Sequence, residues 1–130
     1  MTTRNSLPRP TESELEILAV LWNAGSATVR QTQEQLSKRR EMGYTTVLKL
    51  LQIMHEKGLV KRDESDRTHI YSAAEPRERT QQRIVSNLLD RAFEGSASSL
   101  VMRALSSKKA SSKELIEIRA MLDEMEGKRK

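Results

Sequence analysis

The feature that most constrains the fold is an ordered series of three short helical patterns and one pair of alternating segments within residues 11 to 73. Apolar residues recur at helical spacing in the first and third patterns, which predicts helices with one buried side. Residues 60–62 and 69–71 alternate apolar and polar side chains around a polar turn, which predicts a β-hairpin. Three helices followed by a hairpin form the layout of a winged helix-turn-helix.

Capping residues mark the expected helix ends. A T-x-x-E motif beginning at Thr11 is the pattern of a capping box, and Gly25 is expected to end that first helix. Thr28 is expected to cap a second helix over residues 29 to about 39. The third helix, whose inward stripe we expect to be formed by Val47, Leu50, Leu51 and Met54, should stop at Gly58.

A separate helical module is expected after the hairpin. Pro76 occupies a favoured helix-start position, and an S-x-x-E motif begins a later helix at Ser111. A shorter apolar piece, residues 100–105, is expected to pack within the chain. The other apolar stripes would be exposed on such a small chain, so we expect a homodimer interface formed by Ile84, Leu88, Leu89, Phe93, Leu115, Ile118, Leu122 and Met125.

The predicted fold is therefore mainly α, with a winged-helix domain at residues 8–74 and a helical dimerisation domain at residues 75–126. Only 36% of residues are hydrophobic and 3% aromatic, so a large self-sufficient core is not expected. No apolar run is long enough to span a bilayer, and the first ten residues lack the apolar core of a signal peptide. We therefore expect a cytoplasmic protein.

Catalytic and metal-binding motifs are not found in the sequence. The chain has no cysteine, and neither of its two histidines lies in a ligand-like pattern. The serines are not set in a nucleophile motif, and there is no glycine-rich phosphate loop. We therefore expect neither an enzyme nor a cofactor or metal.

The outward side of the third helix indicates a nucleic-acid partner. Thr45, Thr46, Lys49 and Gln52 project from the side opposite the apolar stripe, toward the helix start, where recognition helices contact base edges. Hydroxyl, amide and ammonium groups can bond to base edges or phosphates. The alternative is that Thr45 is an N-cap and Lys49 a solvated surface charge. The two preceding helices and the following hairpin favour the DNA-binding interpretation.

The hairpin and the second helix supply further candidates. Arg67 is the candidate for a phosphate or minor-groove contact, although acidic residues at the same tip argue against a strong non-specific clamp. Residues at the start of the second helix are placed to contact phosphates. The full candidate set for DNA binding is Thr28, Arg30, Tyr44, Thr45, Thr46, Lys49, Gln52, Arg62 and Arg67.

Two other classes of function remain open. The third helix could dock another protein, or the chain could be an architectural DNA binder without sequence preference. The formal net charge of +5 agrees with an anionic partner but is small for 130 residues. DNA binding would fall steeply with ionic strength, whereas docking of a protein on the helix would fall gently.

Three segments, PTESELEILAVLWNAGSATVRQTQEQL, YTTVLKLLQIMHEKGLVKR and HIYSA, resemble the BlaI/MecI/CopY penicillinase-repressor family over about residues 8–126. The resemblance implies a winged-helix domain, a C-terminal homodimer module, dyad-symmetric double-stranded DNA operators and repression of transcription. It also implies that recognition is carried by Thr45, Thr46, Lys49 and Gln52 and the wing contact by Arg67.

The chain departs from this family at several positions. In the antibiotic-responsive members a membrane sensor protease system triggers cleavage of an Asn-Phe bond, and the matching pair here is Arg103-Ala104. The Cys-x-Cys pair of the copper-responsive branch is absent. Family members often carry arginine where this chain has Leu48 and Ile53, which either lie half-buried under the wing or contact the groove. The resemblance thus implies the mode of binding and leaves the inducing signal open.

Overall fold

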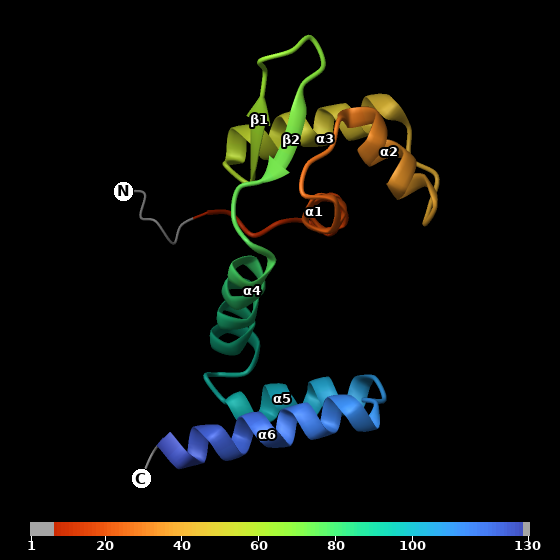
Figure 1. Cartoon of the computed structure of the whole chain (residues 1–130). Coiled ribbons are helices and arrows are strands. Elements are labelled where there is room, and N and C mark those ends of the chain that lie inside the picture. Colours follow the sequence, from red (N-terminus) through yellow and green to blue (C-terminus); the bar gives the residue numbers. More distant parts are fainter. Residues whose placement is uncertain (1–6, 129–130) are drawn as a thin grey trace. The chain divides into compact units, whose positions relative to one another are not determined.

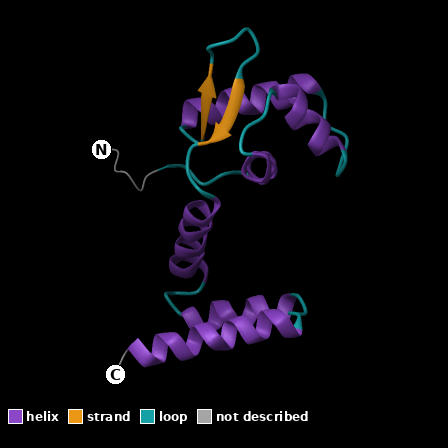
Figure 2. Cartoon of the chain, in the orientation of Figure 1, coloured by secondary structure: helices purple, strands orange, loops and turns teal. Residues whose placement is uncertain are grey.

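The computed structural model describes residues 7–128, in which six helices and one two-stranded antiparallel sheet are found (Figures 1 and 2). Their order is α1 (Glu12–Ala24), α2 (Val29–Ser37), α3 (Tyr44–Lys57), β1 (Val60–Asp63), β2 (Ile70–Ala73), α4 (Arg77–Ala92), α5 (Ala97–Ser107) and α6 (Ser112–Lys128). The predicted fold, mainly α with a winged helix-turn-helix, is confirmed. The chain divides into two compact units, and the division falls between Val85 and Ser86, inside α4.

The caps that define α1 are those predicted. The Glu14 amide donates to Thr11 Oγ1 at 3.2 Å, and the Thr11 amide donates to Glu14 Oε1 at 2.9 Å. Gly25 ends the helix with a φ of 86°, a conformation that a residue with a Cβ rarely adopts. Local sequence alone therefore determines both ends of this helix.

The start of α3 differs from one expectation. Its N-cap is Gly43, which offers no side-chain hydrogen bond, so Thr45 is the second helical residue and the N-cap alternative is wrong. The helix ends at Gly58 in the left-handed conformation, as predicted. The threonine hydroxyls at 45 and 46 are thus not used for capping this helix.

In the hairpin β1 pairs antiparallel with β2, from Val60 opposite Ala73 at one end to Asp63 opposite Ile70 at the other. A short bridge adds the turn between α1 and α2 to this sheet. Ala27 and Tyr71 exchange two backbone hydrogen bonds of 2.8 and 2.9 Å, and the Tyr71 side chain is buried. The base of the wing is therefore fixed to the helical core, while its tip extends beyond it.

One hydrophobic core joins α1, α2, α3 and the hairpin. Leu50, which we expected to face inward with Val47, is only partly buried. Each fully buried aliphatic side chain contributes about 1.5–3 kcal/mol, so this cluster supplies most of the driving force for the unit. The buried apolar members are Ile17, Leu18, Leu21, Ala27, Val29, Leu36, Met42, Val47, Leu51, Met54, Leu59, Val60 and Tyr71.

The second unit, described from Ser86 to Lys128, contains no fully buried residue in a single chain. The predicted capping box at Ser111 is present, with bonds of 3.0 and 3.1 Å to Glu114. Contrary to expectation, the piece at residues 100–105 does not pack away from solvent, because Val101 and Met102 are 45% and 58% exposed. The apolar faces of this unit are thus largely uncovered.

Candidate functional site

The outer side of α3 carries the predicted polar residues. Thr45, Thr46, Lys49 and Gln52 are all exposed, and their spacing places them along one side of the helix. The opposite side is buried through Val47, Leu51 and Met54. The helix therefore presents two hydroxyls, one ammonium and one amide away from the core.

Leu48 and Ile53, whose position the sequence left open, are both half-buried. Leu48 packs against the hydrophobic core and lines a hollow between the starts of α2 and α3 and the wing. Both residues lack hydrogen-bond donors and acceptors in their side chains. At these two positions, which flank the exposed polar residues on opposite sides, α3 can therefore offer only apolar contact.

That hollow, of about 480 Å³, gathers four of the predicted residues from three elements. The wing contributes residues on the way from its tip to β2, and the two helices contribute their first turns. The lining residues are Thr28, Val29, Arg30, Tyr44, Leu48, Arg67, Thr68, His69 and Tyr71. The fold thus brings together candidates that lie as far as 39 positions apart in the sequence.

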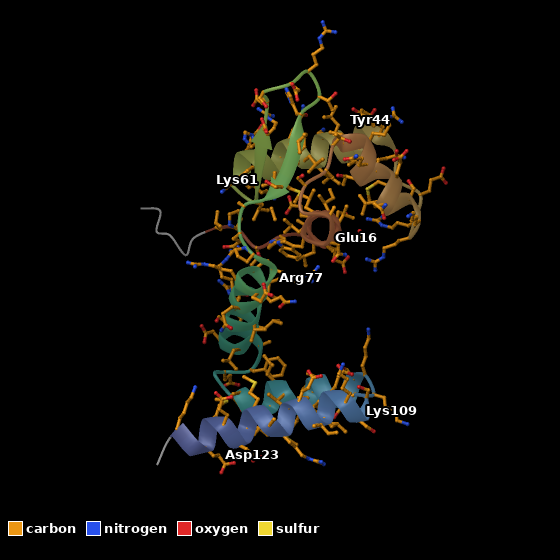
Figure 3. The ribbon with its side chains drawn as sticks, viewed as in Figure 1. Glu16, Tyr44, Lys61, Arg77, Lys109 and Asp123 are labelled. Atoms are coloured by element: carbon orange, nitrogen blue, oxygen red, sulfur yellow. The ribbon has the colours of Figure 1, made fainter. Side chains whose placement is uncertain are left out.

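Arg30 and Tyr44 contact each other at the edge of this hollow. The guanidinium carbon lies 5.1 Å from the centroid of the Tyr44 ring, within the range of a cation–π interaction. Tyr44, labelled in Figure 3 at the start of α3, is 42% exposed, so the pair is accessible to a partner. The sequence did not predict this contact, which joins the first turns of two separate helices.

Thr28 is engaged in a cap. Its hydroxyl accepts from the Gln31 amide at 3.1 Å, and its own amide donates to Gln31 Oε1 at 2.9 Å. This second capping box fixes the start of α2. The amides of Val29 and Arg30 lie in the first turn, where a helix leaves donors without internal partners. The positive end of α2 is therefore directed outward beside Arg30.

The basic residues of the wing differ in their pairing. Arg62 Nε donates to Glu64 Oε2 at 2.8 Å, and this hydrogen bond lowers the pKa of Glu64. Lys61, labelled in Figure 3, and Arg67 are exposed, and no carboxylate among residues 7–128 forms an ion pair with either. Of the two predicted wing arginines, Arg62 is therefore the less available for a partner.

Within the described part of the chain, no group of three or more histidine, cysteine, aspartate or glutamate residues could hold a metal ion. Over the same residues, no helix is both long enough and apolar enough to cross a membrane.

A three-helix core with an attached wing and an exposed polar helix defines the winged-helix class of protein. Solved structures share this fold. RosR of H. salinarum, in a complex, aligns with a TM-score of 0.54 and 18% identity over 98% of both chains. YusO of Bacillus subtilis aligns with a TM-score of 0.50 and 18% identity over 91% of this chain and 75% of that chain. The family model described as penicillinase repressor matches residues 10–124, and the chain belongs to this family. It comprises transcriptional regulators rather than enzymes, as expected from the sequence.

Named relatives agree with this membership. The transcriptional regulator BlaI of Mycobacterium tuberculosis is 38% identical over 73 residues, which are 55% of this chain and 53% of that protein. The chain thus matches about half the length of this relative. The penicillinase repressor of Staphylococcus aureus is 21% identical over 116 residues, covering 89% of this chain and 92% of that protein.

Proposed function

We propose that the protein is a homodimeric, sequence-specific DNA-binding repressor of transcription that binds dyad-symmetric operators. The observation that carries this proposal is the exposed polar side of α3, which adjoins the Arg30–Tyr44 pair and the wing. A recognition helix needs such an uncommitted polar side, backed by a rigid core. Membership of the penicillinase repressor family supports the same conclusion.

In the proposed complex, α3 lies in the major groove. Thr45, Thr46 and Gln52 face base edges, and Lys49 reaches a guanine or a phosphate. Arg30 and the start of α2 contact the DNA backbone, and Arg67 contacts it from the wing. Arg62 contributes less, because its guanidinium is already bonded to Glu64.

The proposed dimer forms through the domain at residues 75–126, whereas the domain at residues 8–74 binds DNA. Exposed apolar side chains of the second unit support this assignment, since single chains rarely leave such large apolar faces uncovered. Leu122 and Met125 are 53% and 55% exposed, and Met102 and Met121, which we did not predict, are more exposed still. The proposed interface contains Ile84, Leu88, Leu89, Phe93, Leu115, Ile118, Leu122 and Met125.

Dimerisation would place two recognition helices about one turn of DNA, roughly 34 Å, apart. Repression would follow from occlusion of a promoter, in the cytoplasm. Release would require loss of the dimer or a cut in the tail, because one half-site retains only part of the contacts. A membrane sensor protease is one agent for such a cut, acting on a bond other than Asn-Phe, since the corresponding pair is Arg103-Ala104 in α5.

The deciding experiment is a selection from a random duplex library with the purified protein, followed by sequencing of the bound pool. Enrichment of an inverted repeat with half-sites about one turn apart would establish a sequence-specific dimer. Bound DNA without any enriched motif would instead identify an architectural binder. No bound DNA at low salt would leave α3 as a surface for docking a protein, and the repressor proposal would be rejected.

A further inference from the structure

The start of α4 is fastened to the winged-helix unit by a network centred on Glu75. Its carboxylate accepts from Thr80 Oγ1 at 2.9 Å and from two guanidinium nitrogens of Arg83. Its backbone oxygen accepts from Trp22 Nε1 at 3.0 Å. Arg83 also donates to the Leu7 carbonyl at 3.2 Å. We call Glu75, Thr80 and Arg83, with their bonds to Trp22 and Leu7, the α4 anchor.

A second contact reinforces the anchor one turn away. Arg77 Nη2 donates to Asn23 Oδ1 at 2.6 Å, and its guanidinium carbon lies 5.6 Å from the centroid of the Trp22 ring. Arg77 is labelled in Figure 3 at the beginning of α4. The end of α1 therefore contacts both Glu75, two residues before α4, and Arg77, the first residue of α4.

Burial distinguishes the anchor from an ordinary surface ion pair. The side chains of Glu75 and Arg83 are 17% and 18% exposed, and Thr80 is buried. Both Arg83 nitrogens and the Thr80 hydroxyl donate to one oxygen of this carboxylate, Oε1, and charge-assisted bonds to a shielded carboxylate are among the stronger ones in proteins. Arg79, in contrast, lies 3.9 Å from the same carboxylate and is 68% exposed, so it adds little.

The boundary between the two units falls after Val85, two residues beyond Arg83, and not at the end of the wing. The first turns of α4 belong to the winged-helix unit, and the helix then continues without interruption to Ala92. The first turns of α4 are therefore held on the winged-helix unit by side-chain bonds as well as by the backbone.

We propose that the α4 anchor sets the spacing and helical phase of the two half-sites that the dimer accepts. This inference rests on the proposed function. Shifting a half-site by one base pair rotates it around the DNA axis as well as moving it along that axis. If α4 is held firmly on the winged helix, such a shift lowers the affinity of the dimer for the DNA. If α4 is held loosely, the two winged helices can adjust to the shift. Glu75 and Arg83 would thus be positioning residues that never touch DNA.

The test compares Arg83→Gln with the matched control Arg79→Gln in the full-length protein. Affinities are measured for the selected operator, for operators with one base pair added or removed between the half-sites, and for a single half-site. Simultaneous engagement of both half-sites raises affinity by about a hundredfold or more, so the wild type should lose roughly that factor on shifted operators. Arg83→Gln should reduce this discrimination by about tenfold and leave single half-site binding unchanged. Arg79→Gln should behave as the wild type.

Amide hydrogen exchange supplies a readout that does not depend on DNA. Residues 77–85 should exchange as slowly as the core of the winged helix in the wild type and faster in Arg83→Gln. Glu75→Gln is the second variant, because it keeps a bond to Thr80 while weakening the one to Arg83. Unchanged exchange in both variants would overturn the anchor.

If residues 77–85 exchange faster in Arg83→Gln but this variant still discriminates fully between the selected and the shifted operators, the proposed role of the α4 anchor in half-site spacing would be overturned. A wild type that selects no inverted repeat would instead reject the proposed function. In that case the exchange experiment still decides whether the anchor exists.

Discussion

The most demanding prediction concerns the bond between Glu14 in α1 and Lys57 at the end of α3. Glu14 is buried, with 2% of its side chain exposed, and Lys57 Nζ lies 2.8 Å from Glu14 Oε2. Lys57→Met removes the cation and keeps most of the aliphatic stem. Removing one partner of a fully buried pair costs about 3–5 kcal/mol. Because Lys57 is a third exposed, we expect a smaller loss, about 2 kcal/mol, in the free energy of unfolding at neutral pH.

The pH dependence tests the cause of this loss. Burial raises the pKa of Glu14, but hydrogen bonds from Lys57 and Thr11 and the charge of Lys57 lower it more, and the pKa ends below its ordinary value. In the wild type this group therefore adds stability above the unfolded-state pKa, and that stability is lost as pH falls through the folded pKa. Without Lys57, two of the causes that lower the pKa of Glu14 are removed, so this pKa should be higher than in the wild type. The difference in the free energy of unfolding between wild type and Lys57→Met should then decrease as the pH is lowered toward about 4.

Urea denaturation at fixed protein concentration, followed by circular dichroism, measures these differences. The set comprises wild type, Lys57→Met, Glu14→Gln and the double variant, with Lys61→Met as the matched control on the exposed face of β1. Lys61→Met should change stability by less than about 0.5 kcal/mol. The reasoning would be refuted if Lys57→Met lowered the free energy of unfolding equally with and without Glu14→Gln, or equally at neutral pH and at about pH 4. In either case the loss of stability would not arise from the Glu14–Lys57 pair.

Three further predictions concern DNA binding and assembly. Lys49→Ala should weaken operator binding and lower the slope of log affinity against log salt by about one unit if Lys49 meets a phosphate; an unchanged slope with altered base preference would place it at a base edge. Tyr44→Leu should weaken DNA binding about threefold to tenfold by freeing Arg30, and Tyr44→Phe should weaken it less. In an Arg30→Ala background the loss caused by Tyr44→Leu should be smaller, and equal losses in the two backgrounds would exclude coupling between Arg30 and Tyr44. Leu122→Lys should yield monomers in analytical ultracentrifugation, and a dimer at micromolar concentration would remove Leu122 from the interface.

Local patterns predicted many of the helix ends in both units, because each pattern involves only a few neighbouring residues. The capping boxes at Thr11 and Ser111 and the stops at Gly25 and Gly58 follow from spacing alone, and all four are present. The inward stripe was predicted equally well except for Leu50. Such features need no knowledge of the tertiary arrangement.

Contacts between distant segments could not be predicted in this way. The bond from Trp22 to the Glu75 carbonyl joins residues 53 positions apart, and the stacking of Arg30 on Tyr44 depends on how two helices cross. No partner for the indole N–H of Trp22 was predicted, although a buried indole commonly finds one. That N–H donor was the signal in the sequence that could have pointed to the α4 anchor.

Two half-buried residues of α3, Leu48 and Ile53, bear on the proposed base recognition, because neither side chain can form a hydrogen bond with a base edge. Hydrogen-bonded readout is thereby left to the short hydroxyls of Thr45 and Thr46 together with Lys49 and Gln52. A half-site read mainly by such groups discriminates less than one read by bidentate arginine–guanine pairs. In the proposed complex, more of the discrimination would then come from the spacing of two half-sites, and a firmly anchored α4 is the feature that we propose supplies it.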